Sequence, residues 1–288
     1  MTKIEIRCPA CNKRGNFEIS EDTLKGVSRG LLAVNIPDGT LCEHTFITYI
    51  DRNLEIRDYF MADFKVELPK ISLSHEQKMK AQRVPSEDIV DVDLIKLNLH
   101  PMLISHILKA IFSKKKVVVI SDLAFLYDHI HKFFSYITTD SFDADITIVR
   151  EEEYKSNKKQ YKDVMVFKDA EILRNFDKTI DPKKLKVEKQ FVHNFISEPE
   201  LGYSYIGLRN DVQKAYEICK EIIQTIEDYR VSGVKEKLGK KRLINILSEK
   251  TNIKLSIQYM EFLLEILKNY FEFDLSIISD YIFPALGI

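Results

Sequence analysis

The sequence predicts a multidomain protein of α+β and α/β class, in which a small β module precedes a central α/β unit with a small sheet and a helical C-terminal region. Three observations lead to this prediction. Alternating β-branched and aromatic residues fill much of residues 1–68, and this alternation is typical of half-buried strands. Short apolar runs alternate with helical patterns in residues 92–180, and helical periodicity continues through residues 181–288.

The composition is that of an ordinary globular protein. The 288 residues are 45% hydrophobic and 30% charged, and the formal net charge is -1. A chain of this length can form more than one core, and its charge balance does not demand a nucleic-acid partner. The first residues lack the layout of a signal peptide, and no apolar run approaches the roughly 18 residues of a membrane span. We therefore expect a cytoplasmic protein without a membrane span.

Residues 1–68 predict a β-rich module with a sheet of three or four strands. Pro37-Asp38-Gly39 is a strong turn signal between two of the strands. A small helix or loop is expected at 20–26, and strands are expected at 3–7, 30–36, 40–50 and 54–60. The polar residues 69–91 carry mixed charge and contain Pro85, so we interpret them as a linker.

Residues 92–180 predict an α/β unit with a three-stranded sheet. A helix is expected from Pro101, because apolar residues repeat at helical spacing after it. Asp122 is predicted to cap a second helix, whose apolar face includes Phe125. The expected strands are short apolar runs at 115–122, 144–149 and 163–167.

Residues 181–288 predict a helical region. Asn210 or Asp211 is expected to cap a long helix with a continuous apolar face. Two further helices are expected at 240–250 and 256–271, and a last short one near 275–283. The helix expected at 256–271 is too apolar to lie in a DNA groove, so it belongs either to the core or to a partner-binding surface.

The first 44 residues contain a pattern of zinc ligands. Cys8 and Cys11 form a C-x2-C pair on a tight turn, and Cys42 and His44 lie two residues apart. Residues i and i+2 of a strand point to the same face, so both donors of the second pair should face the same way. Four such donors complete a tetrahedral structural zinc site. We predict a zinc ribbon-like metal site formed by Cys8, Cys11, Cys42 and His44.

The alternative is that these cysteines are free thiols buried as small apolar residues, which is also our interpretation of Cys219. A module of about 65 residues, however, generally needs a disulfide or a metal to be stable alone. Three of the four cysteines fall in this module, and this favours metal ligation over a disulfide framework in a reducing compartment.

The segments CPACNKRGNFEIS and LCEHTFITYIDRNLEIRDYFMADF, with their spacing, resemble an N-terminal zinc module of uncharacterised archaeal proteins, particularly of the Asgard group. In those proteins similar modules precede varied domains, some of which resemble regulators of small GTPases. The central segment ILKAIFSKKKVVVISDLAFLYDHIHKFF is similar in layout to DENN-type exchange-factor domains. These resemblances imply zinc, and a small GTPase as one possible partner.

Other candidate sites have simpler explanations. Four histidines, His100, His106, His129 and His131, fall in the central unit, but their spacing does not place them on a common helical face. We expect them to be solvated or hydrogen-bonded. Four basic runs, at 114–116, 155–162, 183–189 and 235–242, include or adjoin acidic residues, and a solvated surface is the usual role of such runs.

These observations lead to one main hypothesis and two alternatives. The main hypothesis is a non-catalytic cytosolic adaptor or regulatory protein that mediates protein-protein interaction, with a protein partner such as a small GTPase or a second copy of the chain. The first alternative is a nucleic-acid-binding transcriptional regulator that uses the zinc module and the basic runs. The second is an enzyme acting through the α/β unit, for which the sequence offers no catalytic motif.

Overall fold

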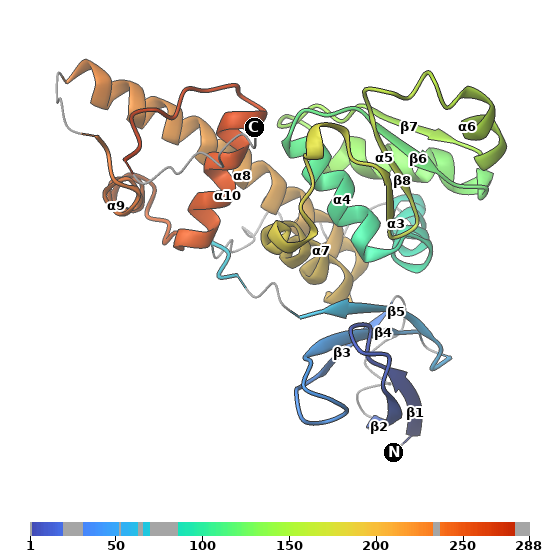
Figure 1. The fold of residues 1–288 in the computed structure, drawn as a ribbon. Helices are drawn as coiled ribbons and strands as arrows, with labels where there is room; N and C mark the ends of the chain where they lie inside the picture. The colour runs from blue at the N-terminus through green and yellow to red at the C-terminus, as the bar shows by residue number, and fades with distance from the viewer. Residues whose placement is uncertain are drawn as a thin grey trace.

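The computed structural model describes residues 2–19, 31–51, 53–62, 66–69, 86–232 and 237–279. Figure 1 shows three parts: an N-terminal pair of sheets, a central α/β unit, and a set of C-terminal helices. This is the mixed fold class that the sequence predicts. The segment 20–26 and residues 70–85 of the predicted linker lie outside the described residues.

The N-terminal module contains two small antiparallel sheets rather than one. Strands β1 (Thr2–Arg7) and β2 (Arg14–Ile19) form a hairpin. Strands β3 (Leu32–Ile36), β4 (Phe46–Ile50) and β5 (Ile56–Met61) form the second sheet in the order β3-β4-β5. Strand β2 was not predicted, because Phe17 and Ile19 are its only large apolar residues.

Strand β4 is buried on both faces. Phe46 and Ile50 face the β1-β2 hairpin and belong to the module's own apolar cluster. Ile47 and Tyr49 face the other way and belong to the main core, together with helical residues of the central and C-terminal parts. Because successive residues of a strand point to opposite faces, β4 joins the module to the rest of the protein.

Polar contacts reinforce this junction. The Tyr49 hydroxyl lies 3.1 Å from Nδ1 of His193. His100 Nε2 lies 2.8 Å from Asp58 Oδ1 of β5, and His100 Nδ1 accepts a hydrogen bond from the Met102 amide at the start of the next helix. His100 therefore caps a helix and contacts the module at the same time.

The central unit is a four-stranded sheet with helices on both faces. Strands β6 (Val117–Ile120), β7 (Ile146–Val149) and β8 (Met165–Lys168) are parallel, and β9 (Glu171–Arg174) pairs with β8 antiparallel, in the order β7-β6-β8-β9. The edge strand β9 adds one strand to the three that were predicted. The helices of this unit are α3 (Ser86–Asn98), α4 (Pro101–Phe112), α5 (Tyr127–Thr138), α6 (Glu151–Asn157) and the short 3-10 turn η1 (Ala124–Leu126).

Two local predictions in this unit were wrong. Asp122 does not cap α5: its Oδ1 accepts a hydrogen bond from the Glu151 amide at the start of α6. The charged segment after β7 forms α6, and its three glutamates in the first turn favour a helix through the macrodipole. Phe125 is 56% exposed rather than part of an apolar helix face.

The C-terminal region contains α7 (Lys186–Ser197), α8 (Leu201–Val231), α9 (Lys240–Thr251) and α10 (Ile257–Asn269), preceded by the 3-10 turns η2 (Phe176–Lys178) and η3 (Pro182–Lys184). The prediction that Asn210 or Asp211 caps the long helix was wrong, since α8 begins at Leu201. Residues 275–279 form turns rather than the expected short helix, and residues 280–283 lie outside the described chain.

One large core contains apolar residues from all three parts. Phe112 of α4 belongs to this core, and its ring centroid lies 4.9 Å from that of Phe142 and 5.4 Å from that of Phe262 of α10. The large apolar residues of α10 are buried apart from Ile257, so this helix belongs to the core rather than to a partner-binding surface. Among the described residues, no helix is both long enough and apolar enough to cross a bilayer.

A charged cluster is buried between α4, α7 and α10. The Lys109 ammonium lies 2.6 Å from Glu265 and 3.5 Å from Glu188, and only Glu265 is substantially exposed. Burial raises the pKa of Glu188 even though Lys109 is near. Burial opposes charge on Lys109, but the two carboxylates outweigh it and raise the pKa of Lys109. One ammonium group thus pairs with two carboxylates, and burial favours the protonated form of Glu188.

Glu188→Gln is expected to reduce the pH dependence of stability. A group whose pKa is raised in the folded state contributes stability below its unfolded pKa, and this contribution is lost as the pH rises. Wild-type stability should therefore fall as the pH increases above the ordinary Glu value of 4.5. Urea unfolding of both proteins between about pH 5 and 8 measures this slope. If the free energy of unfolding changed equally with pH in the two proteins, the raised pKa of Glu188 would be contradicted.

Candidate metal centre

The first ligand pair lies in the turn between β1 and β2. The Cys8 amide donates to the Lys13 carbonyl (2.9 Å), and the Asn12 amide donates to the Cys8 carbonyl (2.9 Å). Asn12 adopts a left-handed conformation with φ of 61°, which asparagine tolerates better than most residues. The Asn12 side chain also accepts a hydrogen bond from Arg7 Nε (3.0 Å). The turn therefore holds the Cys8 and Cys11 side chains on one side of the hairpin.

The second ligand pair lies in the loop between β3 and β4. The predicted turn forms, with the Thr40 amide donating to the Pro37 carbonyl (3.3 Å) and Gly39 at φ +82°. The Gly39 amide then donates to the Cys42 carbonyl (2.8 Å). Cys42 and His44 thus precede β4 instead of lying on it, so our argument from strand alternation was wrong, although both side chains still face the first pair.

The two loops pack closely against each other. A Cβ atom on Gly15 would lie 2.5 Å from Leu41 Cδ1, so the absence of a side chain at Gly15 lets the second loop approach β2. The Tyr59 hydroxyl accepts a hydrogen bond from the Arg7 amide (3.1 Å) and ties β5 to the first loop. These supporting residues were not predicted, because their role depends on pairing between distant segments.

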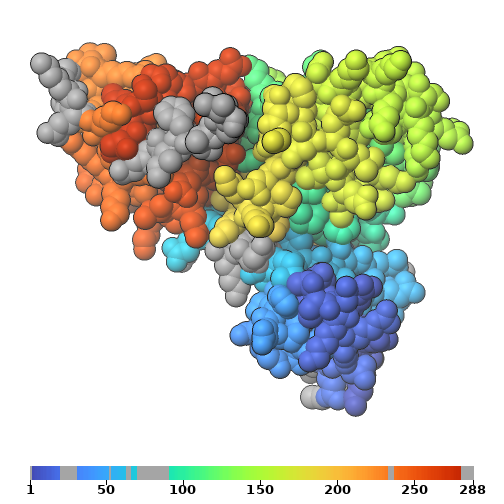
Figure 2. Space-filling model, in the orientation of Figure 1, coloured from blue at the N-terminus to red at the C-terminus, as the bar shows by residue number. Residues whose placement is uncertain are grey.

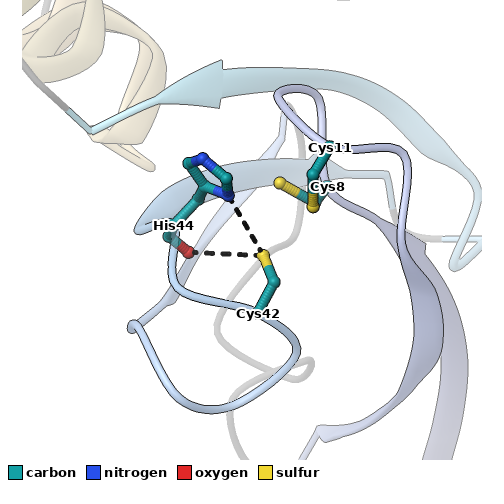
Figure 3. A group of neighbouring side chains, drawn as sticks. All are labelled: Cys8, Cys11, Cys42 and His44. Atoms are coloured by element: carbon teal, nitrogen blue, oxygen red, sulfur yellow. Dashed lines mark hydrogen bonds between the residues drawn. The ribbon is translucent and has the colours of Figure 1, made fainter.

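The four predicted ligands converge on one point (Figure 3). One donor atom from each of Cys8, Cys11, Cys42 and His44 lies within 4.8 Å of all the others. Tetrahedral zinc, with bonds of about 2.3 Å to sulfur and about 2.1 Å to nitrogen, separates a sulfur and a nitrogen ligand by about 3.6 Å. Cys42 Sγ lies 3.6 Å from His44 Nδ1. This group can hold a metal ion, and its donor set is compatible with zinc.

The environment of the thiols also suits a cation. Burial opposes ionisation of Cys8, but hydrogen bonds from the amides of Cys11 and Ala10 outweigh it and lower the pKa of Cys8. Burial raises the pKa of Cys42, and the thiols of Cys8 and Cys11 add to this increase. Several thiolates at such short range repel one another, and a divalent cation between them relieves this repulsion.

The other candidate residues do not gather into a second centre within the described part of the chain. His100 contacts Asp58, and His129 Nδ1 lies 2.6 Å from Asp91. His106 is buried against the ring of Phe167, and burial lowers its pKa to about 4. Cys219 is buried in α8, where its thiol lies 3.7 Å from the Leu263 carbonyl.

Several lysines of the basic runs form ion pairs in the described part of the chain. Lys115 lies 2.8 Å from Asp177, Lys116 lies 3.2 Å from Asp145, and Lys155 lies 2.8 Å from Glu151. No protein-family model matches this chain, and a search of curated proteins finds no match.

Proposed function

We propose that Cys8, Cys11, Cys42 and His44 bind one structural zinc ion. The observation that carries this proposal is the convergence of three sulfurs and one imidazole nitrogen from two loops. Four protein ligands fill a tetrahedral site and leave no position for water or substrate. The ion would fasten the β1-β2 hairpin to the loop before β4, and these two segments contribute to one small apolar cluster.

The metal content of the purified protein tests this proposal. Inductively coupled plasma mass spectrometry is expected to find one zinc per chain after dialysis against a weak chelator. Cys11→Ser should lose the ion, because a thiolate ligand is removed. Cys219→Ala should keep it, because Cys219 lies in α8 away from the cluster. A metal-free wild-type protein, or equal zinc in both variants, would contradict the proposal.

We propose further that the whole chain is a non-catalytic adaptor or regulatory protein in the cytoplasm. A metal site with four protein ligands has a structural role, because it fixes the shape of the surface around it. Figure 2 shows the N-terminal residues as a lobe that projects from the remaining molecule. Leu123 and Phe125, which are 45% and 56% exposed, follow the carboxyl end of β6. Loops at the carboxyl ends of parallel strands commonly carry binding residues.

A small GTPase is the first partner to test, because the resemblance of the sequence to Asgard zinc-module proteins and DENN-type domains implies it. Purified small GTPases, in nucleotide-free and GTP-loaded forms, can be titrated against the protein by biolayer interferometry. Leu123→Ser/Phe125→Ser should abolish binding. Leu173→Ser/Val231→Ser, which changes two exposed apolar residues elsewhere, should not. If no GTPase form bound the wild-type protein, this partner would be excluded. Equal loss of binding in both double variants would count against this surface.

Nucleic-acid binding is the weaker candidate. It is supported by the zinc module and the basic runs, and four lysines of these runs already contact carboxylates. A regulator that neutralises several phosphates would bind duplex DNA more tightly as the salt concentration falls. Absence of such binding at low ionic strength would exclude this function.

A further inference from the structure

A basic cleft lies between the central unit and the C-terminal helices. It has a volume of about 780 Å³ and is bordered by the end of α4, the segment 177–184 and one side of α10. Six lysines and four carboxylates line it, so lysine is in surplus by two charges. The lysines are Lys109, Lys115, Lys178, Lys184, Lys240 and Lys268.

The cleft brings together basic runs that are far apart in the sequence. Lys115, Lys184 and Lys240 come from three of the four runs identified in the sequence. Like charges gathered at one site repel one another, and this costs free energy unless anions compensate them. Folding nevertheless places these lysines along one cleft, at the junction of two parts of the molecule.

The four carboxylates do not compensate all of the lysine charge. Each of them already has a partner, and for three of them that partner is one of the six lysines. Glu265 pairs with Lys109, Asp177 with Lys115, and Glu261 with Lys240. The fourth, Asp181, accepts a hydrogen bond from the Lys183 amide (3.0 Å).

The surplus charge is therefore assigned to Lys178 and Lys184. Lys268 lies in the last turn of α10, where a cation offsets the negative end of the helix dipole. Lys178 and Lys184 are exposed, and neither side chain contacts a partner among the described residues. The ammonium groups of Lys178 and Lys184 are therefore available to bind a ligand.

The wall that carries Lys178 is held in a fixed shape. Asn175 Nδ2 donates to the Ile180 carbonyl (2.7 Å), and the Ile180 amide donates back to Asn175 Oδ1 (3.0 Å). Between these residues, Asp177 and Lys178 both have positive φ, at 54° and 51°, which costs free energy in non-glycine residues. Lys109, which also lines the cleft, is almost fully buried and fixed by its two carboxylates. The lysines are thus presented by a preorganised frame.

We propose that this cleft binds a small molecule that carries several phosphate groups. Lysine ammonium groups bind phosphate as point charges, and the volume of the cleft lies in the range of small-molecule sites. Ser113, Thr179 and Asn269 also line the cleft and supply neutral hydrogen-bonding groups. The phosphates belong either to a free metabolite or to a lipid headgroup.

Isothermal titration of the full-length protein with sodium tripolyphosphate at low ionic strength tests the proposal. The wild-type protein is expected to bind. Lys178→Glu/Lys184→Glu should weaken the affinity by about tenfold or more, because two charge-assisted contacts become repulsive. The matched control is Lys183→Glu/Lys186→Glu, which makes the same charge change on neighbouring lysines that do not line the cleft. Its affinity should stay within about twofold of wild type.

Circular dichroism and melting curves of both double variants establish that each remains folded. Sedimentation with vesicles that contain a phosphoinositide distinguishes the source of the phosphate. Binding to vesicles that tripolyphosphate reverses indicates a lipid headgroup, and binding of tripolyphosphate without vesicle binding indicates a soluble ligand. Failure of the wild-type protein to bind tripolyphosphate would overturn the proposal, and so would equal weakening in both double variants.

Discussion

Replacing Cys42 with serine is expected to abolish metal binding and release the N-terminal hairpin from the rest of the module. The remaining ligands cannot complete the tetrahedron, and structural zinc contributes on the order of 10 kcal/mol or more to small folds. Strands β1 and β2 form a two-stranded sheet, which is only marginally stable by itself. Calorimetry should therefore show a new transition at low temperature, and metal analysis should show no retained zinc.

The matched control for this experiment is Cys219→Ala. It removes a buried thiol from α8 and should lower stability modestly while the zinc content stays at one per chain. The helical parts of Cys42→Ser should remain folded, because their core is formed mostly by residues after position 86. A Cys42→Ser protein with the melting curve and metal content of wild type would disprove the ligand assignment.

Lys109→Met is expected to be the most destabilising single substitution in the charged cluster. It leaves Glu188 and Glu265 without their shared ammonium group, and breaking a buried ion pair costs about 3–5 kcal/mol. The loss should be smaller towards acid pH, because burial raises the pKa of Glu188 and a protonated carboxyl no longer needs the cation. Urea unfolding at two pH values measures both effects.

A second substitution distinguishes charge from packing. In Lys109→Met/Glu188→Leu the buried carboxylate is also removed, so much of the lost stability should return. Lys114→Met breaks an exposed pair with Glu272 and should change stability by less than about 1 kcal/mol. If Lys109→Met were as mild as Lys114→Met, the buried cluster would not contribute to stability as we describe.

The sequence predicted those features that depend on local pattern. The positions of β6, β7 and β8 follow from short apolar runs, and the starts of α4 and α10 follow from Pro101 and from apolar periodicity near residue 256. The four candidate ligands were predicted from donor type and spacing alone, and the structure brings them together. Cys-x-x-Cys is a common spacing of zinc ligands, so this prediction did not need knowledge of the tertiary structure.

Other features depend on contacts between distant segments, and the sequence pattern could not supply them. Asp122 looked like a cap for the helix that follows it, but the amide it reaches is that of Glu151. Asn210 and Asp211 looked like the start of a helix, yet burial of Leu201 and Tyr205 extends α8 in the N-terminal direction. In both cases tertiary packing outweighed a local preference.

The position of β4 between two apolar clusters has a consequence for amide hydrogen exchange. Its alternate side chains belong to the module on one face and to the main core on the other. Its amides should therefore exchange only when the main core opens, at the rate of the slowest helices. Those of β1 and β2 need only the hairpin to detach and should exchange much faster once the metal is chelated. The boundary between the two cooperative units would then fall inside the module, between β2 and β4, rather than in the polar segment that follows it.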